Sequence, residues 1–180
     1  MVYVLAENGF EETELIVPVD ILRRGGVEVK IVGVSGEYVS STRNITLKTD
    51  IKLDDLILYD MEMLVIPGGQ PGVDNLWNDL RVRKLVEESA KADKFIGAIC
   101  AAPMILGRLG LLQGKNATCY PGCEEDLAGA NIKKDETVRD GMIITSRGAG
   151  CAFSFGAELL NALTDKENAD KVVKSMQYNV

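Results

Sequence analysis

Short runs of consecutive apolar residues recur along this chain, separated by longer segments with helical spacing. The runs are rich in Val, Ile and Leu, which is typical of strands buried on both faces. They lie at 2–6, 27–34, 63–66 and 95–99. The intervening segments carry apolar residues at amphipathic-helix spacing. The clearest of these segments are 11–24, 79–91, 152–163 and 167–177. Alternating strands and helices predict an α/β fold, with a mostly parallel sheet covered by helices on both faces.

Three regions add detail to this alternation. Residues 37–52 are polar with short extended pieces and predict a hairpin. Segments 116–120 and 137–145 predict further strands, with Asp140-Gly141 as a hairpin turn. A helix is predicted to start just after Cys100, where Pro103 suits the first helical turn. The pattern contains no repeat or linker, so we expect a single domain over residues 1–180.

The composition restricts the partners and the compartment. A net charge of −7 and a pI near 4.7 argue against nucleic acid or an anionic membrane as the main partner. The longest uncharged apolar stretch, 95–107, is too short to span a bilayer. The amino terminus has no basic region of the kind that begins a signal peptide, and four cysteines do not form a disulfide scaffold. We therefore expect a cytoplasmic protein.

The chain contains no histidine, which limits its chemistry more than its charge does. Neither a Cys-His nor a Ser-His catalytic pair can be formed within the chain. Zinc sites lose their commonest nitrogen ligand. Cys119 and Cys123 are four residues apart, but no second close pair completes a cysteine-only site. We therefore expect no metal and no cofactor.

Cys100 is the first candidate for chemistry. It ends the predicted strand 95–99 and precedes a predicted helix, so its thiol is expected near the positive end of the helix dipole. That setting favours the nucleophilic thiolate. The alternative is a buried cysteine that only packs, which is a common role for a free cysteine.

Four places that follow predicted strands are expected to converge at one edge of the sheet: the loops 6–14, 67–72 and 146–150, and the turn at Cys100 itself. Gly68-Gly69 can present backbone N–H groups to an oxyanion, or can simply form a tight turn. Glu14 either complements the helix dipole or turns inward, because Pro18 cannot donate to its carbonyl and loosens the helix there. An inward Glu14 beside Cys100 would share one proton with the thiol.

Several motifs occur in order along the chain. They are Leu5-Ala6 with Glu11-Glu12-Thr13-Glu14, Val17-Pro18-Val19-Asp20 with Arg23-Arg24-Gly25-Gly26, Val65-Ile66-Pro67-Gly68-Gly69, Ala98-Ile99-Cys100-Ala101-Ala102-Pro103 and Thr145-Ser146-Arg147-Gly148. Together they resemble the DJ-1/ThiJ/PfpI superfamily, most closely its DJ-1 branch, over essentially the full length. The resemblance implies a flavodoxin-like three-layer sandwich and a homodimer formed through the first helix.

The resemblance also implies roles for individual residues. Cys100 takes the nucleophile and oxidation-sensor position, and Glu14 is its protonated partner. The remaining residues line the pocket or the dimer interface. Gly69 and Ala101 supply oxyanion N–H groups, Gly68, Tyr120 and Gly148 line the pocket, Arg43 reaches the partner's pocket, and Asp20 and Arg24 form an interface ion pair. The i,i+4 spacing of the last two also permits an ordinary helix-surface pair.

Tyr120 stands where several members of the family carry a histidine, and a phenol is a poor base at neutral pH. The remaining cysteines, Cys119, Cys123 and Cys151, either include a resolving thiol or only pack.

The resemblance implies glutathione-independent glyoxalase or protein deglycase activity, on small reactive aldehydes or on glycated protein side chains. The competing hypothesis is a redox sensor or protective chaperone-like protein whose Cys100 oxidises to sulfinate. A cysteine peptidase is disfavoured because histidine is absent.

Overall fold

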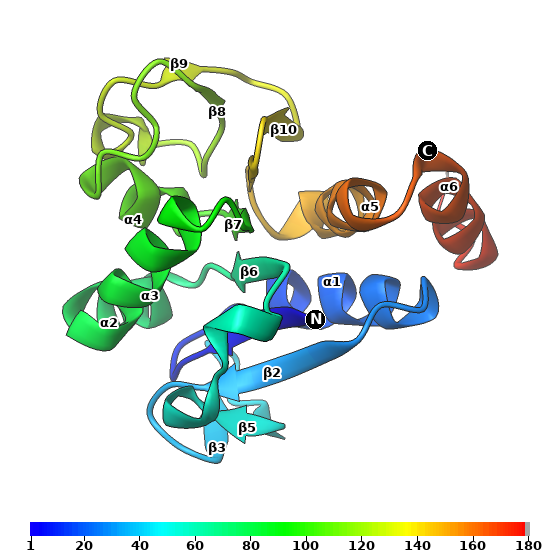
Figure 1. Cartoon of the computed structure of the whole chain (residues 1–180), viewed down its shortest axis with the longest axis horizontal. Coiled ribbons are helices and arrows are strands. Elements are labelled where there is room, and N and C mark those ends of the chain that lie inside the picture. The colour runs from blue at the N-terminus through cyan, green and yellow to red at the C-terminus, as the bar shows by residue number, and fades with distance from the viewer. Residues whose placement is uncertain (179–180) are drawn as a thin grey trace.

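A computed structural model describes residues 1–178, and its centre is a seven-stranded sheet (Figure 1). The strand order is β10-β11-β7-β6-β1-β2-β5, and every neighbouring pair is parallel except β10 with β11. This confirms the mostly parallel sheet. The strands are β1 (Val2–Ala6), β2 (Val29–Gly33), β5 (Ile51–Lys52), β6 (Met63–Ile66), β7 (Phe95–Ile99), β10 (Thr137–Asp140) and β11 (Ile143–Ser146). Residues 179–180 of the predicted domain lie outside the described part.

Helices cover both faces of the sheet, as predicted (Figure 1). Alternate side chains of β1 enter different cores: Val2 and Val4 pack on one face, whereas Tyr3 and Leu5 pack on the other. The first face carries α1 (Glu12–Arg24), α5 (Ala152–Leu163) and α6 (Lys166–Ser175); the second carries α2 (Gln70–Asn78), α3 (Leu80–Lys91) and α4 (Pro103–Arg108). None of the described helices is long and apolar enough to cross a membrane.

Two glycines allow α5 to pack closely against its neighbours. A Cβ at Gly156 would collide with Ile21 of α1, and a Cβ at Gly97 of β7 would collide with Leu159 of α5. The absence of these two methyl groups therefore brings α1, α5 and the sheet together. This packing fixes the position of α1, whose first turn lies at the carboxyl ends of the strands.

The regions outside the main sheet agree only partly with the sequence pattern. The predicted hairpin in 37–52 is present as β3 (Tyr38–Ser40) paired with β4 (Thr46–Lys48), and the turn at Asp140-Gly141 is also confirmed. The strand predicted at 116–120 is wrong in extent, because only β8 (Asn116–Ala117) is extended. It pairs with β9 (Asn131–Ile132) in a separate small sheet beside α4 (Figure 1).

The sequence pattern did not predict helix α2. We interpreted Pro67 to Gly72 as a loop because of its prolines and glycines. The helix begins at Gln70, and Pro71 lies in the first turn, where its missing N–H leaves no hydrogen bond unmade.

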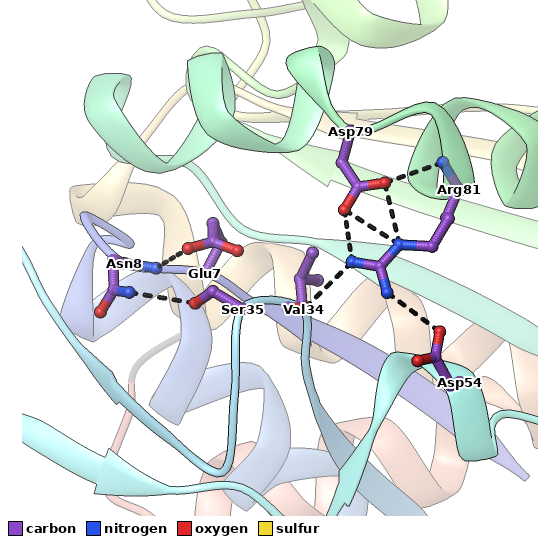
Figure 2. A network of polar contacts seen from close by, with 7 residues as sticks. All are labelled: Glu7, Asn8, Val34, Ser35, Asp54, Asp79 and Arg81. Carbon is purple, nitrogen blue, oxygen red and sulfur yellow. Dashed lines mark hydrogen bonds and ion pairs between the residues drawn. The ribbon is translucent and has the colours of Figure 1, made fainter.

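A polar network ties the loops after β1 and β2 to the start of α3 (Figure 2). The side chain of Asn8 donates to Ser35 at 3.0 Å, which links the two loops. Arg81 donates to the carbonyl of Val34 at 3.3 Å and is itself held by Asp79 and by Asp54 at 2.9 Å. These contacts hold in place one side of the sheet edge that carries the candidate site.

Candidate active site

Cys100 directly follows β7 in an unusual backbone conformation. Its φ is 67°, a region that non-glycine residues rarely adopt and that costs about 1–3 kcal/mol. Two backbone hydrogen bonds hold it there: its N–H donates to Ser146 at 2.9 Å, and its carbonyl accepts from Tyr120 at 2.8 Å. The surrounding structure therefore imposes a sharp turn that leaves the thiol half-buried at the strand ends.

Glu14 points inward from the first turn of α1 and is only 1% exposed. Glu11 caps this helix by accepting the Glu14 N–H at 2.8 Å. The Glu14 carboxylate accepts from the Gly68 N–H at 2.9 Å, and the Ala149 N–H and the Cys100 side chain lie near enough to oppose the rise in its pKa. The structure thus brings Glu14 and Cys100 together, and Glu14 does not act merely as a surface charge at the helix end.

Gly68 fits between these two side chains because it has no Cβ. A Cβ there would collide with the Glu14 carboxylate, with the Cβ of Cys100 and with the backbone carbonyl of Ile99. The adjacent Gly69 has a φ of 94° and precedes α2. Its N–H and that of Ala101 lie near enough to the Cys100 sulfur to oppose the rise in the pKa of the thiol. Gly68 therefore allows Glu14 and Cys100 to approach each other, and Gly69 allows the turn before α2.

We predict that Gly68→Ala separates the pair and destabilises the fold. The backbone carbonyl of Ile99 cannot move aside as a flexible side chain would, so overpacking should cost about 1–3 kcal/mol. Urea unfolding measures this change, with Gly36→Ala as the control because a Cβ at Gly36 meets nothing within 4 Å. Equal unfolding midpoints for the two variants would contradict the prediction.

Burial raises the pKa of Glu14 to about 7, and the charge of Glu11 adds to the rise. Hydrogen bonds from Cys100, Gly68 and Ala149 oppose it. A carboxyl with a pKa near 7 can both accept and donate a proton at neutral pH, which suits general acid–base catalysis.

We expected the helix dipole to lower the pKa of Cys100, and the structure does not support that expectation. Helix α4 has only six residues and starts three positions after the cysteine. Burial, the Glu14 carboxylate charge and the hydrogen bond to Glu14 raise the pKa of Cys100 to about 12, against the N–H groups of Gly69 and Ala101. The short helix α4 therefore does not offset the effects that raise the pKa of this thiol.

The two groups are best described as one titrating pair. Below about pH 7 the pair holds two protons, and above that pH it holds one, because the pKa of Glu14 is about 7 and that of Cys100 about 12. The single proton can sit on sulfur or on the carboxyl without changing the net charge. The form with thiolate and carboxylic acid is the one that can attack an electrophile.

We predict that Glu14 makes the protein less stable as the pH rises. Folded Glu14 keeps its proton up to about pH 7, whereas an unperturbed glutamate loses it near pH 4.5, so the folded state binds more protons in this window. The free energy of unfolding therefore falls by up to about 3 kcal/mol between these pH values. Urea unfolding of wild type and Glu14→Gln across this range measures the difference, and parallel curves for the two proteins would contradict it.

Tyr120 and Gly148 form a wall of the site. A Cβ at Gly148 would lie 3.3 Å from the Tyr120 ring and 3.8 Å from the Glu14 carboxylate. Tyr120 itself is 53% exposed. The tyrosine therefore covers the site beside Glu14, and its backbone N–H fixes the Cys100 carbonyl.

Three of the sequence-predicted residues lie away from Cys100 in this chain. Arg43 is exposed, and its N–H donates to Glu12 at 2.7 Å. Arg24 pairs with Asp20 at 2.9 Å along α1, with both side chains about half exposed. The i,i+4 pair is thus present, and the interface roles of these three residues stay predictions.

Two contributors to the site were not singled out from the sequence. The carbonyl of Ser146 anchors Cys100, and the N–H of Ala149 bonds Glu14. Both residues act through backbone groups, so the identity of their side chains did not indicate a role in the site. Only the position of 146–150 after a strand pointed to them. The other cysteines are free: Cys119 and Cys151 are buried and Cys123 is half-buried.

Comparisons with known proteins agree with this geometry. The model of the DJ-1/PfpI family matches residues 1–162. Protein dj-1beta of Drosophila melanogaster is 33% identical over 96% of this chain and 94% of its own length. Glutathione-independent glyoxalase DJR-1.2 of Caenorhabditis elegans is 31% identical over 92% of this chain and 89% of its own.

Solved structures show the same fold. Drosophila melanogaster DJ-1beta superposes with a TM-score of 0.93 at 32% identity, covering 99% of this chain and 98% of the other. Toxoplasma gondii DJ-1, described as oxidized, gives a TM-score of 0.94 at 29% identity over the same shares. The fold is therefore the flavodoxin-like sandwich of these proteins, and the chain belongs to the DJ-1/PfpI family.

Proposed function

We propose that this chain detoxifies small reactive carbonyls without glutathione, using Cys100 as the nucleophile and Glu14 as its proton carrier. The observation that carries the proposal is the buried carboxyl of Glu14, which lies beside the half-buried Cys100 thiol and has its pKa raised to about 7. A family member that is named as a glutathione-independent glyoxalase supports this chemical class.

The proposed reaction is redox-neutral. The Cys100 sulfur adds to the aldehyde carbon of methylglyoxal while its proton passes by way of Glu14 to the new oxygen, which gives a hemithioacetal. Glu14 then carries the proton from the former aldehyde carbon to the neighbouring carbon, while the hydroxyl proton moves from the oxygen of the first carbon to the oxygen of the second, so that a lactoyl thioester forms. Water releases lactate and restores the thiol. Overall, methylglyoxal and water give lactate.

The backbone supports the same steps. The N–H groups of Gly69 and Ala101 oppose the rise in the pKa of the Cys100 thiol, and in this proposal they stabilise negative charge on the sulfur or on the oxygen of a bound aldehyde. The same addition can start from an early glycation adduct on a protein side chain. Glycated side chains are therefore the second substrate class of this proposal.

A redox-responsive role is the second candidate. Its support is that Cys100 is half-buried, whereas Cys119 and Cys151 are buried, and that a solved relative is described in oxidized form. In this role a peroxide oxidises Cys100 to sulfinate, which the protonated Glu14 carboxyl stabilises by a hydrogen bond. Dilute peroxide followed by peptide mass spectrometry tests whether two oxygens add selectively at Cys100.

A homodimer through α1 is part of the same proposal. Ile16 on this helix is 47% exposed, so an interface formed through α1 would bury an apolar side chain. In such a dimer Arg43 would approach the partner's pocket, and Asp20 and Arg24 would lie at the interface.

The direct test of the activity is lactate formation from methylglyoxal by purified protein in the absence of glutathione and other thiols. We expect enzymatic turnover. A parallel assay with a purified methylglyoxal adduct of N-acetylarginine, run with a trap for free aldehyde, separates deglycation from glyoxalase activity. Lactate formation no faster than in buffer alone would remove the glyoxalase assignment.

A further inference from the structure

A second cavity, of about 320 Å³, lies behind the Tyr120 loop, between the small β8–β9 sheet and the end of β11. The wall of this second cavity is rich in positive charge. Arg147, Lys133 and Lys134 line it, and Glu124 is the one carboxylate among its lining residues. Cys119 adds no opposing charge, because burial raises the pKa of its thiol to about 12. The lining therefore carries a net charge of about +2 at neutral pH.

Arg147 has a guanidinium group without a partner in the described part of the chain. Its Nε is buried and has no hydrogen-bond partner, and within residues 1–178 none of its guanidinium nitrogens bonds a protein acceptor or pairs with a carboxylate. An unpaired guanidinium that has lost part of its hydration is costly, and its planar fork matches a phosphate or a carboxylate.

Arg83 provides an internal comparison. It is the other arginine in the described part of the chain whose Nε is buried without a partner. Its guanidinium carbon, however, lies 5.1 Å from the centroid of the Trp77 ring, so a cation–π contact compensates it. Arg147 has no such aromatic contact among the described residues and faces a cavity with two more cations.

The two lysines line the cavity as exposed residues and, within the described part of the chain, pair with no carboxylate. The backbone N–H of Lys133 donates to Ala117 at 2.8 Å, which fixes this segment beside β8. Neither Lys133 nor Lys134 forms an ion pair within the described residues. The carboxylate of Asp126 pairs instead with Arg108 at 2.9 Å. Three unpaired cations opposed by one carboxylate favour a ligand with two negative charges over a monoanion.

We propose that this second cavity binds the phosphate group of a small molecule, as a site distinct from Cys100 and independent of the proposed reaction. Arg147 bonds the phosphate through its fork, and Lys133 and Lys134 neutralise the remaining charge. The second cavity shares the 118–121 segment with the active site, and the N–H of Tyr120 in that segment bonds Cys100. A phosphate bound in the second cavity can therefore shift Tyr120 in the wall of the active site.

Calorimetric titration with inorganic phosphate at constant ionic strength tests the proposal. We expect saturable binding by wild type, weakened about tenfold or more in Arg147→Met and in the double variant Lys133→Gln with Lys134→Gln. Glu124→Gln should strengthen binding, because it removes the one carboxylate of the lining. If Arg147→Met fails to fold, the affinities of Glu124→Gln and of the lysine double variant for phosphate still test the proposal.

The matched controls are Arg83→Met and a double variant of two exposed lysines outside the second cavity, Lys91→Gln with Lys174→Gln. Both should bind phosphate as wild type does. Equal affinity in wild type and the cavity variants would overturn the proposal, as would equal losses in the controls. Acetate titrated in parallel distinguishes the ligand class, and tighter binding of acetate than of phosphate would overturn the phosphate assignment.

Discussion

Replacing Cys100 with alanine should abolish lactate formation from methylglyoxal, with a loss of a thousandfold or more in kcat/KM, on the order seen when an enzyme loses its nucleophile. No other thiol can substitute, because Cys119 and Cys151 are buried, and the carboxylates near Cys123, Asp126 and Glu124, act on it only through their charge, which raises the pKa of its thiol. The measurement is enzymatic detection of lactate under saturating and limiting substrate.

The control for this change is Cys123→Ala, which removes a cysteine of the same half-buried class. It should retain wild-type turnover. If Cys100→Ala kept a substantial fraction of the activity, or if both variants lost it equally, Cys100 would not be the nucleophile.

Replacing Glu14 with glutamine should reduce kcat by about a hundredfold to ten-thousandfold, which is the usual contribution of general acid–base catalysis. Glutamine has nearly the same shape and can still accept the Gly68 N–H, which Glu14 accepts at 2.9 Å. It cannot carry a proton between sulfur and substrate. The loss should therefore fall on kcat more than on KM.

Glu7→Gln is the matched control, because Glu7 is the other buried carboxyl residue of the described chain, at 6% exposed compared with 1% for Glu14. Glu7 lies in the loop after β1 and accepts from the Asn8 N–H (Figure 2). Its replacement should leave kcat unchanged. A Glu14→Gln variant with wild-type kcat would show that the carboxyl only fills space.

The central sheet and the convergence at its edge could be predicted from the sequence because buried parallel strands have a distinctive apolar pattern. Strand β1, Val2–Ala6, is buried throughout, and its boundaries agree with the pattern. Helix α2 was missed because Pro71 and Gly72 are typical of loops, and only tertiary packing showed that they begin a helix. The main sheet also excludes residues 118–120, which the local pattern could not show.

The sequence predicted that Glu14 and Cys100 lie together, but it did not predict the electrostatic environment of the pair. Glu14 and Cys100 were predicted to share a proton, and the structure places them in contact. The positive φ of Cys100 depends on backbone bonds to Ser146 and Tyr120, which lie far away along the chain. The length of α4, and therefore the weakness of its dipole, likewise became visible only in the fold.

The account rests on one claim: Glu14 and Cys100 titrate as a pair, and the pair becomes reactive when it loses its first proton. The rate of Cys100 alkylation by iodoacetamide, followed by peptide mass spectrometry across pH, tests this claim most directly. The account predicts a midpoint at or below about pH 7, the pKa of Glu14, and a shift to higher pH in Glu14→Gln. A midpoint near the free-thiol value of about 8.5 in both proteins would contradict it.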